Sequence, residues 1–244
     1  MRNIKANHSF LKGITDGLPI CVGYVSVAFA FGIFATESGM TLMQALLISM
    51  TNVTSAGQLA AVPIIAAGGS LAELAMAQLV INLRYALMSV SLSQKLDRSV
   101  GLFHRFIISF VNTDEVFAVA SGKKGSVGKP YLYGLILTPY LGWSLGTLVG
   151  AGAGNILPDA VTSALGIAIY GMFVAIVMPQ AKASRKTALC VLTAIAFSCA
   201  FFYIPLLSKI PAGFTIIICA VAASAIFAVA APLPFVDEEG EKSA

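Results

Sequence analysis

Apolar stretches long enough to cross a bilayer recur along the whole sequence, and short polar loops separate them. A helix needs about 20 apolar residues to span the hydrocarbon core of a membrane. The stretches are residues 18–35, 42–67, 73–92, 103–121, 131–152, 160–178, 188–207 and 211–231. This pattern predicts an all-α polytopic membrane protein with about eight apolar segments, two of which are interrupted by polar residues.

The composition supports this fold class. Hydrophobic residues make up 58% of the chain and charged residues only 11%, whereas soluble domains contain about 25% charged residues. The net charge of +4 comes from lysines and arginines in short loops and does not indicate a nucleic-acid partner. We predict one membrane domain over residues 1–244, with a cytoplasmic lead-in at 1–15 and an acidic tail at 235–244.

The sequence argues against an enzyme. It has no Ser/His/Asp set, no Gly-rich phosphate loop and only two histidines. Its four cysteines lie far apart in apolar segments, without metal-ligand spacing, which predicts buried and unreactive thiols. We therefore expect no metal site and no cofactor.

Polar residues interrupt the second apolar segment at 51–55. Ser55, with Gln58 three positions later, fits a capping box at the start of a helix. This pattern predicts two half-helices, about 42–50 and 56–67, and discontinuous helices of this kind carry substrate sites in many transporters. The alternative is a single long, kinked helix whose hydroxyl groups bond back to its own carbonyls.

The fourth segment is interrupted by Asn112, Thr113, Asp114 and Glu115. Two acids within a membrane-length segment are expensive to bury, so they indicate a functional site. Asn112 can cap a helix whose capping-box partner is Glu115, which leaves Asp114 to contact a solute or a proton. We predict a helix that restarts inside the bilayer, with its free N–H groups facing a polar cavity.

The third segment carries polar residues on two faces. Gln78, Asn82 and Ser89 share one face, at spacings of four and seven. Arg84 lies near the middle on another side, where an unpaired arginine is costly. Two roles for Arg84 stay open. One is structural: it could reach the nearer interface, clamp loose backbone carbonyls or hold an acid of the fourth-segment break ionised. The other is direct contact with a solute.

Glycines recur every four residues in the fifth segment, at Gly142, Gly146, Gly150 and Gly154. This stripe predicts tight helix contact, either within the protein or with a partner. The stretches 17–32 and 134–150 share an early proline and spaced glycines. In addition, Thr54-Ser55-Ala56 recurs at 162–164, and these similarities suggest an internal repeat.

Loop charges predict the orientation, because lysines and arginines favour cytoplasmic loops. Both termini are expected in the cytoplasm. If all eight segments span, the loop at 94–105 lies outside although it holds Lys95, Arg98 and Arg105. If both interrupted segments are re-entrant, this loop moves inside and Lys209 alone lies outside. The number of spans stays open at this point.

The order of several short motifs resembles the AzlC family, the large subunit of bacterial branched-chain amino acid exporters. The motifs are Gly17-Leu18-Pro19, Phe31-Gly32, Ser55-Ala56-Gly57-Gln58, Asn82-Leu83-Arg84-Tyr85, Thr113-Asp114-Glu115, Trp143 and Gly146. The resemblance implies export of valine, leucine and isoleucine across the bacterial inner membrane. It also implies a small membrane partner of the AzlD type.

A zwitterionic amino acid needs an anion site, a cation site and an apolar pocket. Helix starts at Ser55 and Asn112 could hold its carboxylate. Asp114 or Glu115 could hold its ammonium group or carry a coupling proton. The candidate substrate-binding residues are Ser55, Gly57, Gln58, Asn82, Arg84, Thr113, Asp114 and Glu115. The alternatives are a channel or transporter for another small solute, and a membrane scaffold that transports nothing.

Overall fold

The computed structural model of the chain describes residues 9–153, 158, 171, 174, 177–179 and 181–230. The helices fall into two compact units, residues 1–172 and 173–244, which are described separately below. Five of the helices are long and apolar enough to cross a membrane. The predicted class, an all-α polytopic membrane protein, is confirmed.

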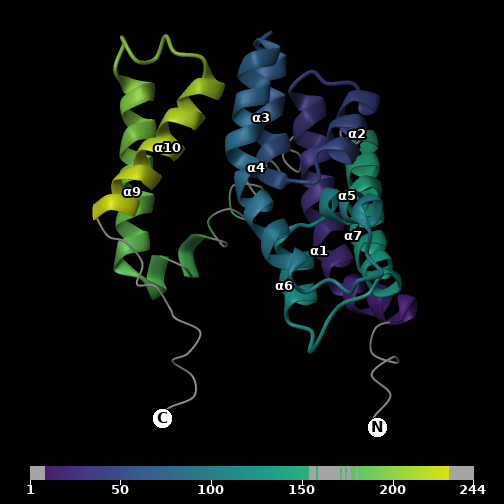
Figure 1. Cartoon of the computed structure of the whole chain (residues 1–244). Coiled ribbons are helices and arrows are strands. Elements are labelled where there is room, and N and C mark those ends of the chain that lie inside the picture. Colours follow the sequence, from purple (N-terminus) through teal and green to yellow (C-terminus); the bar gives the residue numbers. More distant parts are fainter. Residues whose placement is uncertain are drawn as a thin grey trace. The chain divides into compact units, whose positions relative to one another are not determined.

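Seven helices make up the described part of the first unit (Figure 1). They are α1 (Phe10–Glu37), α2 (Leu42–Thr51), α3 (Ser55–Ala66), α4 (Leu71–Ser93), α5 (Leu102–Phe110), α6 (Asp114–Ser121) and α7 (Lys129–Ala153). The first span was expected to begin near residue 18, which is wrong. The helix begins eight residues earlier because the Ser9 hydroxyl caps it by accepting a bond from the backbone N–H of Lys12.

Helices α1 and α7 pack side by side and run in the same direction. The paired positions are 121 residues apart: Gly142 lies against Cys21, Gly146 against Val25 and Gly150 against Phe29. A Cβ atom added at Gly146 would lie 2.6 Å from the Val25 carbonyl oxygen. The predicted glycine stripe therefore makes a tight helix contact, and this contact lies within the protein, although Gly154 is outside the described residues.

The second apolar segment forms a hairpin of two half-helices, as predicted. Helix α2 runs antiparallel to the second half of α7, with the Ser49 hydroxyl 2.7 Å from that of Thr147. Helix α3 then returns along the first half of α4, where Gly57 lies beside Gln78. A ten-residue helix is only about 15 Å long, half of a hydrocarbon core of about 30 Å. The hairpin therefore turns at mid-depth.

The fourth segment forms a second hairpin, α5–α6, which enters from the opposite end. Helix α5 begins beside the start of α7, where His104 Nδ1 lies 2.8 Å from the Tyr133 hydroxyl. Helix α6 returns along the second half of α4 and ends near the loop that follows α4, where Lys95 donates to the Ser121 carbonyl. Both interrupted segments thus form hairpins that begin and end on one side of the first unit. This is the geometry of a re-entrant segment, and it favours the topology in which the loop at 94–105 lies inside.

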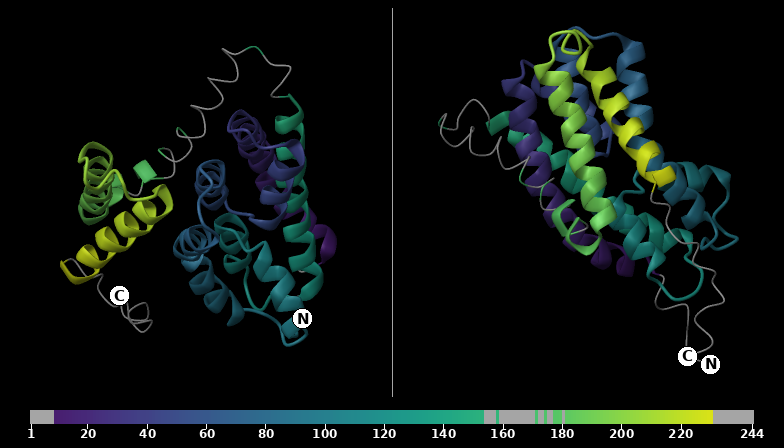
Figure 2. Two further views of the ribbon diagram at one scale, coloured as in Figure 1. Left: turned by 90° about the horizontal axis from the view of Figure 1, so that it is seen from above. Right: turned by 90° about the vertical axis from the view of Figure 1, so that its left-hand side faces the viewer.

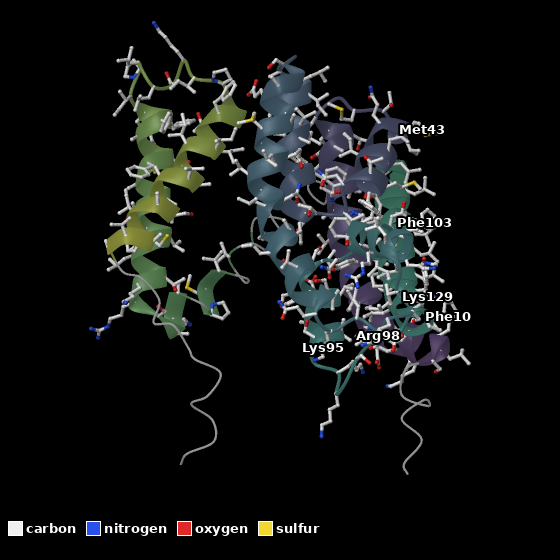
Figure 3. All side chains as sticks on the ribbon, viewed as in Figure 1. Phe10, Met43, Lys95, Arg98, Phe103 and Lys129 are labelled. Carbon is white, nitrogen blue, oxygen red and sulfur yellow. The ribbon has the colours of Figure 1, made fainter. Side chains whose placement is uncertain are left out.

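This arrangement gathers the basic loops at one end of the first unit. Figure 3 labels Lys95, Arg98 and Lys129 at that end, whereas Met43 marks the opposite end. At this end Asp16 links α1 to the loop after α6, because it forms ion pairs with Lys12 at 2.7 Å and with Lys123 at 2.6 Å. Asp16 itself lies inside α1.

One pattern of elements occurs twice in the first unit. In α1–α3 and again in α4–α6, a long helix is followed by a hairpin that enters from the side where that helix ends. The two copies have opposite orientations, as in the inverted repeats of many transporters. The sequence similarity of 17–32 to 134–150 instead relates two helices, α1 and α7, that pack on each other. Residues 162–164 lie outside the described residues.

The second unit contains α9 (Arg185–Tyr203) and α10 (Ala212–Ala230), which pack together as a hairpin (Figure 2). The seventh segment was predicted to extend to residue 207. Helix α9 ends four residues earlier because Pro205 disfavours helical backbone at the residue before it. Most of the sixth segment, 160–178, lies outside the described residues.

Candidate functional site

The tips of the two hairpins meet beside the middle of α4 and enclose a cavity of about 130 Å³. Both hairpins contribute its walls together with α4. The lining residues are Thr51, Asn52, Val53, Thr54, Asn82, Tyr85, Ser109, Phe110, Asn112 and Thr113. Most of these side chains are polar, so the non-helical backbone at both breaks faces a polar cavity, as predicted.

Four helix ends surround this cavity. Helices α2 and α5 end at Thr51 and Phe110, and their terminal carbonyl groups give these ends partial negative charge. Helices α3 and α6 begin at Ser55 and Asp114, where free N–H groups give partial positive charge. The cavity therefore offers both signs of charge within a small volume.

A network of amide side chains attaches the α2–α3 tip to α4. The Gln78 Nε2 group donates to the Gly57 carbonyl at 2.9 Å, and Gln78 Oε1 accepts from Asn52 Nδ2 at 2.9 Å and from Asn82 Nδ2 at 3.3 Å. A Cβ atom at Gly57 would lie 2.7 Å from Gln78 Oε1, so the network requires glycine there. The predicted polar face of α4 thus faces the hairpins.

The α5–α6 tip is attached to the same face of α4, closer to the C-terminal end of that helix. Asn112 Nδ2 donates to the Ser89 hydroxyl at 3.2 Å. Two buried oxygen atoms in the cavity walls, Asn82 Oδ1 and Asn112 Oδ1, have no hydrogen-bond partner within the described part of the chain. Asn112 as a whole is only 3% exposed, so water is largely excluded from it.

Arg84 and Asp114 form an ion pair of 2.7 Å that joins α4 to the first residue of α6. Arg84 also donates to the Tyr85 hydroxyl at 3.0 Å and lies over its ring. Both charged side chains are about half exposed. The arginine thus pairs with an acid of the fourth-segment break, one of the two roles left open above.

Glu115 accepts a hydrogen bond of 2.5 Å from the Tyr24 hydroxyl of α1. The Tyr24 oxygen also lies 2.6 Å from the Thr113 hydroxyl, so α1 reaches the α5–α6 tip. The predicted capping box of Asn112 and Glu115 is wrong. The N-cap is Thr113, one residue later, because its hydroxyl accepts from the N–H of Val116.

The capping box predicted at Ser55 and Gln58 is also wrong. Thr54 is the N-cap of α3 and no side chain caps this helix, which leaves its N–H groups available to a ligand. The capping box of this hairpin lies instead between Thr41 and Gln44, at the start of α2. Gln58 is fully buried away from the cavity, and neither polar atom of its side chain has a partner in the described residues.

The candidate residues are mostly brought together. Asn82 and Thr113 line the cavity, and Ser55, Arg84, Asp114 and Glu115 are within two positions of lining residues. Sequence reasoning missed Thr51, Asn52, Thr54 and Tyr85 as lining residues, and Tyr24 as a partner of Glu115. Asn112 was expected at the site as the start of a helix, and it lines the cavity with its side chain. One signal was available for the tips, because each break contains an asparagine followed closely by the threonine at the N-cap position of the next helix.

A larger cavity of about 560 Å³ lies between α5 and α7, with Phe106, Phe110 and Tyr140 among its lining residues. Its surface is almost entirely apolar, and it touches none of the candidate residues. It therefore lacks the polar groups that orient a ligand, and the smaller cavity at the hairpin tips is the better candidate site.

Comparison with known proteins places the first unit in a family. Residues 19–157 match the family described as AzlC protein, and this match covers most of α1 and all of α2–α7. The inner membrane protein YgaZ of Escherichia coli (strain K12) is 30% identical over 77% of this chain and 78% of its own length. An uncharacterized membrane protein of Archaeoglobus fulgidus is 33% identical over 75% of this chain and 80% of its own length. A further uncharacterized membrane protein, from Helicobacter pylori, is 27% identical over 72% of this chain. No solved structure matches the chain.

Proposed function

This chain belongs to the AzlC family, and from that membership we propose that it is a transporter that exports branched-chain amino acids across the cytoplasmic membrane. The observation that carries the proposal is the cavity where two re-entrant hairpins meet from opposite ends of the first unit. Substrate sites of transporters lie at such midplane junctions of broken helices. The family resemblance supplies the substrate class of valine, leucine and isoleucine.

The helix ends support a zwitterionic substrate. The start of α3 suits a carboxylate, because no side chain caps its N–H groups and its dipole is positive. The start of α6 adds a positive dipole end, although the Thr113 hydroxyl caps one of its N–H groups. The ends of α2 and α5 suit an ammonium group. Val53 and Phe110 provide apolar contact for an aliphatic side chain. A solute with a single charge would satisfy only one pair of these helix ends.

The acids beside the cavity support coupling to protons. The Asp114 carboxylate can take up and release a proton, because this side chain and that of its partner Arg84 are both half exposed. Glu115 is held by Tyr24 and forms no ion pair within the described residues. We assign Asp114 to the coupling proton, and Ser55, Gly57, Asn82, Thr113 and Glu115 to the substrate site or its support. Gln58, which lies away from the cavity, is assigned to the transport path.

The basic loops support an orientation with the start of α1 in the cytoplasm. Lys95, Arg98 and Lys129 lie at that end (Figure 3), and Lys12 and Lys123 are joined to each other through Asp16 of α1. The opposite loops, 38–41 and 67–70, contain no lysine or arginine. Because basic loops stay in the cytoplasm, both termini are expected there.

A small membrane partner of the AzlD type is part of the proposal, on the family resemblance. The glycine stripe cannot supply its contact, because α1 occupies it. Helix α4 is a better surface, since its large apolar side chains Leu79, Leu83 and Leu87 are exposed. A partner or an aqueous cavity would also shield Arg84 from lipid, where a charge is costly.

The test is amino acid flux in proteoliposomes. Proteoliposomes that contain the purified protein, with or without the small partner, are loaded with unlabelled valine. Uptake of labelled valine by counterflow is then measured with and without a pH gradient. Saturable exchange supports the proposal, and stimulation by the gradient supports proton coupling. Non-saturable flux would instead indicate a channel, and an absence of flux from a stable complex with the partner would indicate a scaffold.

The matched variants are Asn112→Leu, at the cavity, and Gln94→Leu, at the end of α4 outside it. Counterflow should fall at least tenfold in the first variant, because a hydrogen bond to a charged group contributes about 1.5–3 kcal/mol. It should be unchanged in the second. Equal activity of both variants would place the substrate elsewhere.

A further inference from the structure

Two amide oxygens in the cavity wall are not paired with any of the charged residues nearby. Asn82 Oδ1 and Asn112 Oδ1 are buried, belong to the walls of the same cavity and have no hydrogen-bond partner in the described residues. Buried polar atoms are nearly always bonded, so an unpaired pair in one cavity calls for an explanation. A bound ligand that supplies positive charge or N–H donors is such an explanation.

The amide network fixes the orientation of Asn82. The Gly57 carbonyl can only accept, so Gln78 must turn its nitrogen toward it and its oxygen toward Asn82. Asn82 then donates with Nδ2 to that oxygen, and its own oxygen is left free. The unpaired atom is therefore an acceptor and not a misassigned nitrogen.

The surroundings of these oxygens favour a cation. The ends of α2 and α5, at Thr51 and Phe110, point partial negative charge at the same cavity. Among the described residues, no lysine, arginine or histidine lines it. The nearest acid along α6, Asp114, is engaged by Arg84 and does not line the cavity.

The charge of the cation follows from the same residues. The side chains that line the cavity in the described part of the chain carry no carboxylate, and divalent ions in proteins are usually held by carboxylates. Neutral oxygens and helix carbonyl ends are the ligands that transporters use for monovalent ions. We propose that Asn82 and Asn112 bind a small monovalent cation, which is either the ammonium group of the solute or free Na⁺. Only the ammonium alternative rests on the proposed function.

The test measures the melting temperature of the purified full chain in detergent. The probes are NaCl against choline chloride, L-valine, its amine-only analogue isobutylamine and its carboxylate-only analogue isovalerate. Stabilisation by Na⁺ alone identifies a free ion, and stabilisation by isobutylamine and valine identifies the ammonium group. If neither Na⁺ nor isobutylamine stabilises the protein, the inference is wrong. If isovalerate raises the melting temperature as much as valine does, the ammonium group is not what the site binds.

Variants separate binding from folding. Asn82→Leu and Asn112→Leu should each raise the half-saturating cation concentration at least tenfold, whereas Gln94→Leu should leave it unchanged. Asn112→Asp keeps the oxygen and adds charge, so it should bind the cation at least as tightly even if the leucine variants fold poorly. Cation stabilisation that is unchanged in Asn112→Leu, or lost in Asn112→Asp, would overturn the site. Cation binding without valine flux would instead refute the proposed function alone.

Discussion

Arg84 on α4 and Asp114 at the start of α6 hold the α5–α6 tip against α4 through an ion pair of 2.7 Å. The same tip is held to α1 by Tyr24 and to Ser89 by Asn112. The hairpin is thus attached at its turn, while its helices are short. Attachments of this kind can be released without unfolding the long helices, as a moving gate requires.

The ion pair should behave as one unit in stability. Arg84→Gln and Asp114→Asn each leave one charge without its partner, and each should lower the melting temperature by a few degrees, from about 1 kcal/mol for a half-exposed pair. The double variant should lose no more than the worse single variant. Thermal unfolding of the four proteins in detergent measures this, and additive losses would show that the two residues act separately.

The two neighbouring acids should differ in transport. Asp114→Asn is expected to abolish pH-driven valine export while the protein stays folded, because an amide cannot carry the coupling proton. Glu115→Gln should be milder, since its amide oxygen can still accept from Tyr24. Valine efflux and melting temperature are compared for both. Normal export by Asp114→Asn, or its loss through unfolding, would contradict these roles.

The α1–α7 contact should tolerate no side chain. In Gly150→Ala the added Cβ meets the Phe29 carbonyl, which costs about 1–3 kcal/mol of overpacking or more. The control is Gly23→Ala on α1, where nothing lies within 4 Å of the new atom. That variant should be neutral or slightly stabilised, because alanine is the better helix former. Equal melting temperatures would show that α1 and α7 are not packed so closely.

Cysteine labelling tests the re-entrant hairpins. In a background without native cysteines, Ser99→Cys and Lys124→Cys should react with an impermeant maleimide from the cytoplasmic side only. Glu37→Cys and Ala67→Cys lie at the other end and should react from outside only. The background protein is the unlabelled control. If Ser99→Cys reacts from outside, the second apolar segment crosses the membrane.

Replacing Gln58 by leucine should slow transport without lowering the stability of the protein. Its side chain is fully buried and neither polar atom has a partner in the described residues, so Gln58→Leu removes a desolvation penalty of about 1–3 kcal/mol. We expect a melting temperature at or above that of the wild type, together with slower valine counterflow. A destabilised variant would mean that the amide is bonded in the membrane.

The sequence predicted both half-helix pairs because polar breaks and capping residues are local signals. It misplaced each N-cap by one residue, because Ser55 follows Thr54 and Asn112 precedes Thr113, and serine and asparagine are on average the stronger capping residues. The bond from Tyr24 to Glu115 joins residues 91 apart, and no local pattern announces it. Whether a hairpin spans or returns depends on packing against α4 and α7, which periodicity does not record.

The distance along the chain between α1 and α7 bears on how the protein is made. Their closest contacts join residues 121 apart, as in Cys21 and Gly142. A ribosome that adds about 5–20 residues per second needs on the order of ten seconds to supply the second helix after the first. During that delay the glycine-matched surface of α1 is without its mate. A nascent chain of this kind therefore depends on lipid or on an insertion factor to shelter α1 until synthesis reaches α7.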